Sequence, residues 1–111
     1  MDEIGFDIQG SAPELYRVTF VRRSEINLSA YCTCPAGING QYCKHRFAIL
    51  AGAEDGVVSD NLSDIKTVQS WLPGTDVETA LHRVRELEKE AEKVKKALSA
   101  AKHELARAMR D

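Results

Sequence analysis

Three cysteines and one histidine fall within one short stretch of this sequence, at spacings that suit a metal ion. Cys32 and Cys34 are separated by one residue, eight residues follow, and Cys43 and His45 are again separated by one residue. Three thiolates and one imidazole suit tetrahedral Zn²⁺ and fill all four of its positions. The pattern therefore predicts a structural zinc site, with Zn²⁺ as the cofactor and no open position for a catalytic water.

Other uses of these cysteines fit less well. A disulfide framework is disfavoured because the three cysteines are an odd number and no signal peptide indicates an oxidising compartment. Cys32 and Cys34 are also too close in sequence to bridge each other comfortably. A redox dithiol would show two residues between its cysteines, and that spacing is absent. Incidental burial of the three thiols is the remaining alternative.

Two strands and a helix must bring the four residues together. Alternating apolar residues predict strands at residues 15–21 and 26–32, paired as a hairpin that delivers Cys32 and Cys34 at its end. Proline, glycine and asparagine in the following loop favour a chain reversal. The apolar run 47–51 predicts a short helix that begins near residues 41–43, so the second ligand pair would lie in its first turn. There the free amide groups favour a thiolate.

With these residues in place, the stretch resembles the SWIM zinc finger, whose pattern is Cys-x-Cys, a variable loop and Cys-x-His. The resemblance rests on Cys32-x-Cys34 and on Cys43-Lys44-His45 followed by an apolar helix. It implies a zinc finger over residues 15–53, under half of the chain. Members of this family occur in chromatin-remodelling-type ATPases, Mutator-type transposases, a kinase of the MAP-kinase cascade and recombination-mediator complexes, and they are thought to bind DNA or other proteins. Such varied hosts imply no single activity.

The rest of the chain is expected to form an α+β protein in four regions. Residues 1–14 would be an N-terminal arm with a short strand at 4–8, and residues 15–55 the zinc-stapled hairpin and helix of the finger. Residues 56–74 would hold a short helix at 61–72 and a linker, with Trp71 packed on the domain rather than exposed. Residues 75–111 would form a long coiled-coil helix, which begins with a capping box of Thr75 and Glu78.

The long helix carries an unbroken apolar heptad repeat, which predicts a coiled coil. Positions a and d form its seam: Val77, Ala80, Val84, Leu87, Ala91, Val94, Leu98, Ala101, Leu105 and Ala108. Because a seam needs a partner, we expect a homodimer through this helix. The alternative is a helix that folds back onto its own finger.

The charges beside the seam bear on the direction of pairing. In a parallel pair they form two attractive pairs, Arg83 with Glu88 and Glu90 with Lys95. A centred antiparallel pair mixes attraction with repulsion, because it sets Glu88 opposite Lys102 and Glu90 opposite Glu104. These charges favour the parallel pair and leave the antiparallel pair open.

A nucleic-acid surface requires clustered positive charge. Residues 1–75 carry six Lys and Arg against nine Asp and Glu, so the finger half is not basic overall. Five of these six basic residues nevertheless lie on the predicted hairpin or finger helix. They are the candidates for a nucleic-acid or partner face: Arg17, Arg22, Arg23, Lys44 and Arg46.

We expect no enzymatic activity, because the zinc site is closed and neither a Ser, His and Asp set nor a glycine-rich phosphate loop is present. The sequence favours a non-catalytic adaptor or regulatory protein that dimerises through its C-terminal helix and binds a protein partner. A mobile-element or phage product that inhibits a host complex is a variant of this interpretation. The alternative is a DNA-binding accessory protein that uses the zinc-finger face.

The chain shows no apolar run near the roughly 20 residues that a bilayer span needs, and its acidic N-terminus is unlike a targeting segment. We therefore expect no membrane association and a location in the cytoplasm, or in the nucleus if the source is eukaryotic. The identity of the partner and the source organism are left open.

Overall fold

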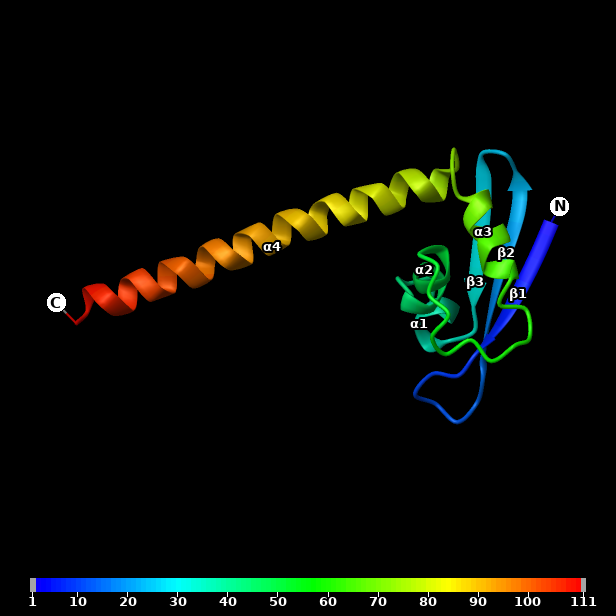
Figure 1. The fold of residues 1–111 in the computed structure, drawn as a ribbon, viewed down its shortest axis with the longest axis horizontal. Coiled ribbons are helices and arrows are strands. Elements are labelled where there is room, and N and C mark those ends of the chain that lie inside the picture. Colours follow the sequence, from blue (N-terminus) through cyan, green and yellow to red (C-terminus); the bar gives the residue numbers. More distant parts are fainter. Residues whose placement is uncertain (1, 111) are drawn as a thin grey trace. The chain divides into compact units, whose positions relative to one another are not determined.

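The computed structural model describes residues 2–110 and confirms the α+β class. The chain divides into two compact units, residues 1–78 and residues 79–111. The first unit contains a three-stranded antiparallel sheet and three short helices, and the second contains most of one long helix (Figure 1).

The sheet is a meander in the order β1-β2-β3, formed by Asp2–Ile8, Tyr16–Ser24 and Asn27–Cys32. The expected hairpin is confirmed as β2 and β3, with Val18 opposite Cys32. The strand expected at residues 4–8 is longer than expected and pairs with β2 along its whole length. In the sequence, the alternation of Ile4, Phe6 and Ile8 was the signal for this strand. The sheet therefore has one strand more than the expected hairpin.

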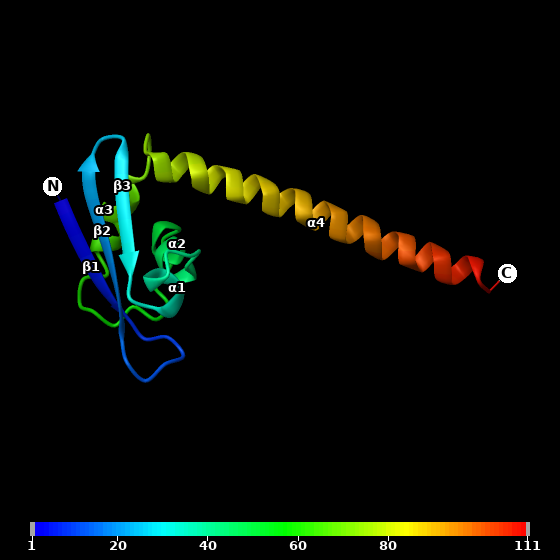
Figure 2. The same ribbon diagram turned by 180° about the vertical axis from the view of Figure 1, so that it is seen from behind.

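One face of the sheet forms the core with helix α3, Asp64–Trp71. Phe6 and Phe20 are fully buried there, with their rings edge to face and their centroids 6.1 Å apart. Figure 1 shows α3 in front of this face, and Figure 2 shows the opposite face with no helix over it. Trp71 is 8% exposed and belongs to the core, which confirms its predicted packing against the domain.

Two further helices follow the sheet and position the zinc-ligand candidates. Helix α1, Pro35–Ile38, is a single turn in the segment that we had predicted to be a turn-rich loop. Helix α2, Lys44–Leu50, is the predicted finger helix and begins one residue after the predicted start. Ile49 and Leu50 of α2 are buried in the core, so α2 is anchored to the same core as the sheet.

Both edges of the sheet carry hydrogen bonds to other segments. At the β1 edge, Asn61 Nδ2 donates to the Gly5 carbonyl over 2.8 Å, and the Val58 N–H donates to the Asp7 carbonyl over 2.9 Å. At the β3 edge, the Leu28 N–H donates to Asp76 Oδ1 over 3.4 Å. Open edges invite pairing with another strand, and these contacts reduce that opportunity.

Helix α4, Asp76–Ala108, contains 33 residues and is about 50 Å long at 1.5 Å per residue. At its start, Thr75 Oγ1 accepts a hydrogen bond from the Glu78 N–H, as a capping box requires. The Glu78 carboxylate accepts from the Gly74 N–H over 3.0 Å, one residue earlier than expected. Within residues 2–110, none of the helices combines the length and apolar character that a membrane span requires.

Candidate metal centre

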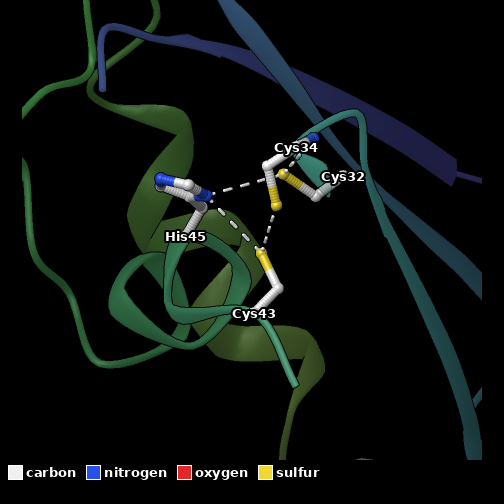
Figure 3. Close-up of side chains that lie close together, drawn as sticks. All are labelled: Cys32, Cys34, Cys43 and His45. Atoms are coloured by element: carbon white, nitrogen blue, oxygen red, sulfur yellow. Dashed lines mark hydrogen bonds between the residues drawn. The ribbon is translucent and has the colours of Figure 1, made fainter. Parts of the chain in front are cut away.

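Cys32, Cys34, Cys43 and His45 lie together, as the sequence predicted. One ligand atom from each residue lies within 4.8 Å of the ligand atoms of the other three. The three cysteines are buried and His45 is half-buried. Figure 3 shows the thiols and the imidazole converging from the end of β3 and the start of α2.

The spacing of the ligand atoms fits tetrahedral zinc. A zinc ion with bonds of about 2.3 Å to sulfur holds its sulfur atoms about 3.8 Å apart. Cys34 Sγ lies 3.4 Å from Cys43 Sγ, and His45 Nδ1 lies 3.6 Å from Cys43 Sγ and 3.8 Å from Cys32 Sγ. The donor set of three sulfurs and one nitrogen is one that zinc prefers. The cluster is thus positioned to bind one zinc ion.

The first ligand pair is held by the turn between β3 and α1. Cys34 is the N-cap of α1, and its Sγ accepts a hydrogen bond from the Gly37 N–H over 3.3 Å. Pro35 occupies the first turn, where its fixed φ suits a helix start and its missing N–H costs nothing. The sequence contained this signal, because proline follows the capping residue, but we interpreted the proline only as a turn former.

Gly37 is required here because the backbone of Cys32 approaches it closely. A methyl group at Gly37 would overlap the Cys32 carbonyl oxygen and lie 2.8 Å from Cys32 Cβ. Gly37 also donates the hydrogen bond to Cys34. This glycine therefore supports both members of the first ligand pair, and cysteine spacing alone did not identify it.

The second ligand pair lies at the start of α2, with Cys43 as its N-cap. Burial by itself would raise the pKa of Cys43, but the hydrogen bond from the Arg46 backbone N–H and contacts with the neighbouring ligands outweigh it and lower that pKa to about 6. Burial raises the pKa of Cys32 to about 12, and the neighbouring thiols add to the effect. The start of α2 thus favours a thiolate at Cys43, whereas the thiolate of Cys32 depends on the positive charge of the metal.

The His45 ring is positioned by Tyr16, the first residue of β2. The two ring centroids lie 5.2 Å apart with the planes inclined by 46°. Nδ1 is the ring nitrogen that faces the sulfurs. Tyr16 was predicted as a strand residue only, and its contact with the histidine links β2 to the metal centre.

The predicted basic residues do not form one free patch. Arg17 is paired with Asp7 over 3.0 Å, and Arg23 donates hydrogen bonds to Ser29 and Tyr31 on the sheet. Arg46 donates to the carbonyls of Ala30 and Gln41. In the part of the chain that the structure describes, only Arg22 and Lys44 of the five predicted basic residues have no hydrogen bond or ion pair.

The fold and the four converging ligands define a small zinc-binding finger. Residues 16–51 match the family model of the SWIM zinc finger. This segment is therefore a SWIM zinc finger with the Cys-x-Cys and Cys-x-His ligand pairs. No curated protein and no solved structure matched the chain in the same comparisons.

We predict that the purified protein contains one zinc ion per chain and that Cys43→Ser loses it, because a hydroxyl is a poor replacement for a thiolate at zinc. Metal content would be measured by elemental analysis after gel filtration. Lys44→Ala is the matched control, since Lys44 lies between the two ligands and is not itself a zinc ligand. Full zinc retention by Cys43→Ser would exclude Cys43 as a ligand.

A second prediction concerns Gly37. Gly37→Ala should weaken zinc binding by on the order of tenfold, as the loss of a group that supports a ligand does, measured by competition with a chelator. Gly40→Asn is the control: Gly40 has a φ of +70° and open space around an added side-chain carbon, and asparagine tolerates this left-handed conformation, so the change should leave both stability and zinc affinity nearly unchanged. Equal zinc affinities for the two variants would refute a specific role of Gly37.

Proposed function

We propose that this protein is a non-catalytic adaptor that dimerises through α4 and binds a protein partner through its zinc finger. The observation that supports it best is the exposure of large apolar side chains in both units. These side chains lie on the helix seam and beside the metal centre, and each set is considered below.

The seam of α4 is largely exposed in the single chain. Val94 is 67% exposed and Leu98 is 54% exposed, and Leu87 and Leu105 are similarly accessible. Val77 differs, because it packs partly against the core of the first unit. A contiguous apolar stripe of this kind favours association with another surface. The repeat is strict over five heptads, which favours a helix of the same sequence as the partner.

The finger exposes a second apolar surface next to the metal centre. Ile38 is 72% exposed and Tyr42 is 63% exposed, and the Tyr42 ring stacks on Phe47 with the centroids 4.6 Å apart. Tyr42 also borders a cavity of about 860 Å³ whose lining includes Tyr16, Pro35 and Ala48. Exposed aromatic residues beside an apolar cavity are typical of anchors in protein interfaces.

Charge favours a protein partner over nucleic acid. Contacts to phosphate carry most of the affinity of DNA-binding proteins, and three of the five predicted arginine and lysine side chains are engaged by partners within the first unit. The acidic balance of residues 1–75 adds to this argument. DNA binding remains the second candidate function, with Arg22 and Lys44 as its available cations.

Neither function needs catalysis, and both suit a protein of the cytoplasm or nucleus. By occupying its partner, the adaptor would also act as the inhibitor expected of a mobile-element or phage product.

Dimerisation is tested by Leu98→Glu, which places charge in the seam and should convert the dimer to a monomer at tens of micromolar, because each dimer would bury two carboxylates. Sedimentation equilibrium gives the mass directly. Ser99→Glu is the control: it adds the same charge to the adjacent residue outside the seam and should remain dimeric. A wild-type monomer at these concentrations would refute the proposal.

The choice of partner is tested by titrating the zinc-loaded protein into labelled single-stranded and duplex DNA at two salt concentrations. We expect binding no tighter than the micromolar range at low salt. Submicromolar binding that weakens with salt and disappears in Arg22→Ala with Lys44→Ala would establish the DNA-binding alternative.

A second experiment places a photo-crosslinking amino acid at position 42 or, as the control, at Thr19 on the open face of the sheet. A protein partner should be crosslinked from position 42 and not from position 19.

A further inference from the structure

We infer that two α4 helices pair antiparallel, so that the dimer carries its two zinc fingers at opposite ends of the coiled coil. The inference rests on the proposed dimerisation and concerns the orientation of the second copy. It differs from the parallel pair that the flanking charges alone favoured. Two features of α4 support it: its charge is unequal between the two halves, and its seam residues are unequal in size.

The charge of α4 changes sign along the helix. Residues 76–92 carry six acidic and three basic side chains, whereas residues 93–110 carry one acidic and six basic side chains. A parallel pair would place the two basic halves side by side and the two acidic halves side by side. An antiparallel pair sets each acidic half against a basic half. The opposite charges then lie within about 10 Å of each other, the distance below which salt does not fully screen their attraction. Antiparallel packing also opposes the two helix macrodipoles.

The seam also combines large with small residues in a way that suits antiparallel packing. In a parallel pair each seam residue faces its own copy, so Ala80, Ala91, Ala101 and Ala108 would each form an alanine layer. Such layers require the helices to approach closely, whereas the leucine layers between them hold the helices apart. One continuous pair of helices cannot satisfy both distances well, and voids would remain at the alanines.

In an antiparallel pair, position a of one helix packs against position d of the other, and large residues meet small ones. Aligning the full seam gives three such layers, Val84 with Ala101, Val94 with Ala91 and Leu105 with Ala80. A fourth layer, Leu87 with Leu98, is the only one inside the helix ends that joins two large residues. The layers are therefore more nearly equal in volume, and a uniform separation of the helices becomes possible.

The residues beside the seam are compatible with this register. In an antiparallel pair, g positions face g positions and e positions face e positions, so Arg83 lies opposite Glu104 of the second copy. Glu88 lies between Lys95 and Lys102 of the second copy. The clash between Glu90 and Glu104 belongs to a different register, because aligning the full seam sets Glu90 opposite Ala97.

The orientation has a consequence for binding. Each finger is joined to the first turn of its own α4, and the two first turns would be separated by about 45 Å, the length of the shared seam at 1.5 Å per residue. A parallel dimer would instead place both fingers at one end and present them to one surface. The antiparallel dimer is thus a bridge, suited to holding two partner molecules or two distant sites on one assembly.

Two charge-exchange variants with the same composition test the orientation in the zinc-loaded full chain. Arg83→Glu with Glu104→Arg should retain the dimer in the antiparallel arrangement, because the opposed pair is exchanged as a unit. Arg83→Glu with Glu88→Arg should weaken it by on the order of tenfold at low salt, because the carboxylate introduced at position 83 then faces Glu104 and the guanidinium introduced at position 88 faces lysines. A parallel dimer predicts the reverse order of the two dissociation constants, and that result would overturn the inference.

A distance measurement gives the orientation without relying on side-chain charge. A nitroxide on a non-thiol amino acid at position 107, which leaves the zinc cysteines untouched, should lie about 40 Å or more from its copy if the helices are antiparallel. A parallel dimer would hold the two labels within about 20 Å, since the helix axes lie only about 10 Å apart. The control label at position 92 lies near the middle of the seam and gives a short distance in either case. Short distances at both positions would overturn the antiparallel assignment, whereas a monomeric wild type would overturn the proposed dimer itself.

Discussion

The first unit depends on one bond network, the coordination of zinc by ligands from two separate segments of the chain. Cys32 ends β3 and Cys34 caps α1, whereas Cys43 caps α2 and His45 lies in its first turn. A unit of 78 residues buries a small apolar core, and the net stability of such a domain is about 5–15 kcal/mol. Structural zinc contributes on the order of 10 kcal/mol. The binding energy of the ion is thus comparable with the whole stability of the unit that it joins.

In the second unit, over the residues that the structure describes, the large apolar side chains of the seam are exposed and have no partner within the unit. A helix of 33 residues can satisfy its backbone hydrogen bonds alone, but its stripe of Val, Leu and Ala remains wet until another surface covers it. The finger is completed by a metal and, in our proposal, the helix is completed by a second chain. In this proposal both parts depend on an added component, zinc for the finger and a second chain for the helix, and the dimer would be a bivalent binding protein.

Local chemistry was predictable from the sequence, and remote packing was not. Ligand type and spacing identified the metal cluster, and strict alternation identified β2 and β3, because both signals lie within a few residues. The length of β1 was missed since its stability comes from pairing with β2, and α1 was missed since a four-residue helix has no periodicity. The arginine partners were equally invisible: the contact between Arg17 and Asp7 exists only because β1 joins the sheet.

Amide hydrogen exchange with and without a zinc chelator tests most directly whether zinc holds the finger together. With zinc bound, the amides of β2 and β3 should exchange slowly, because their hydrogen bonds lie in the sheet beside the buried core. After removal of zinc they should exchange at rates near those of an unfolded chain, while the middle of α4 should keep the protection that the proposed dimer would provide. Strong protection of β2 and β3 in the metal-free protein would contradict the account.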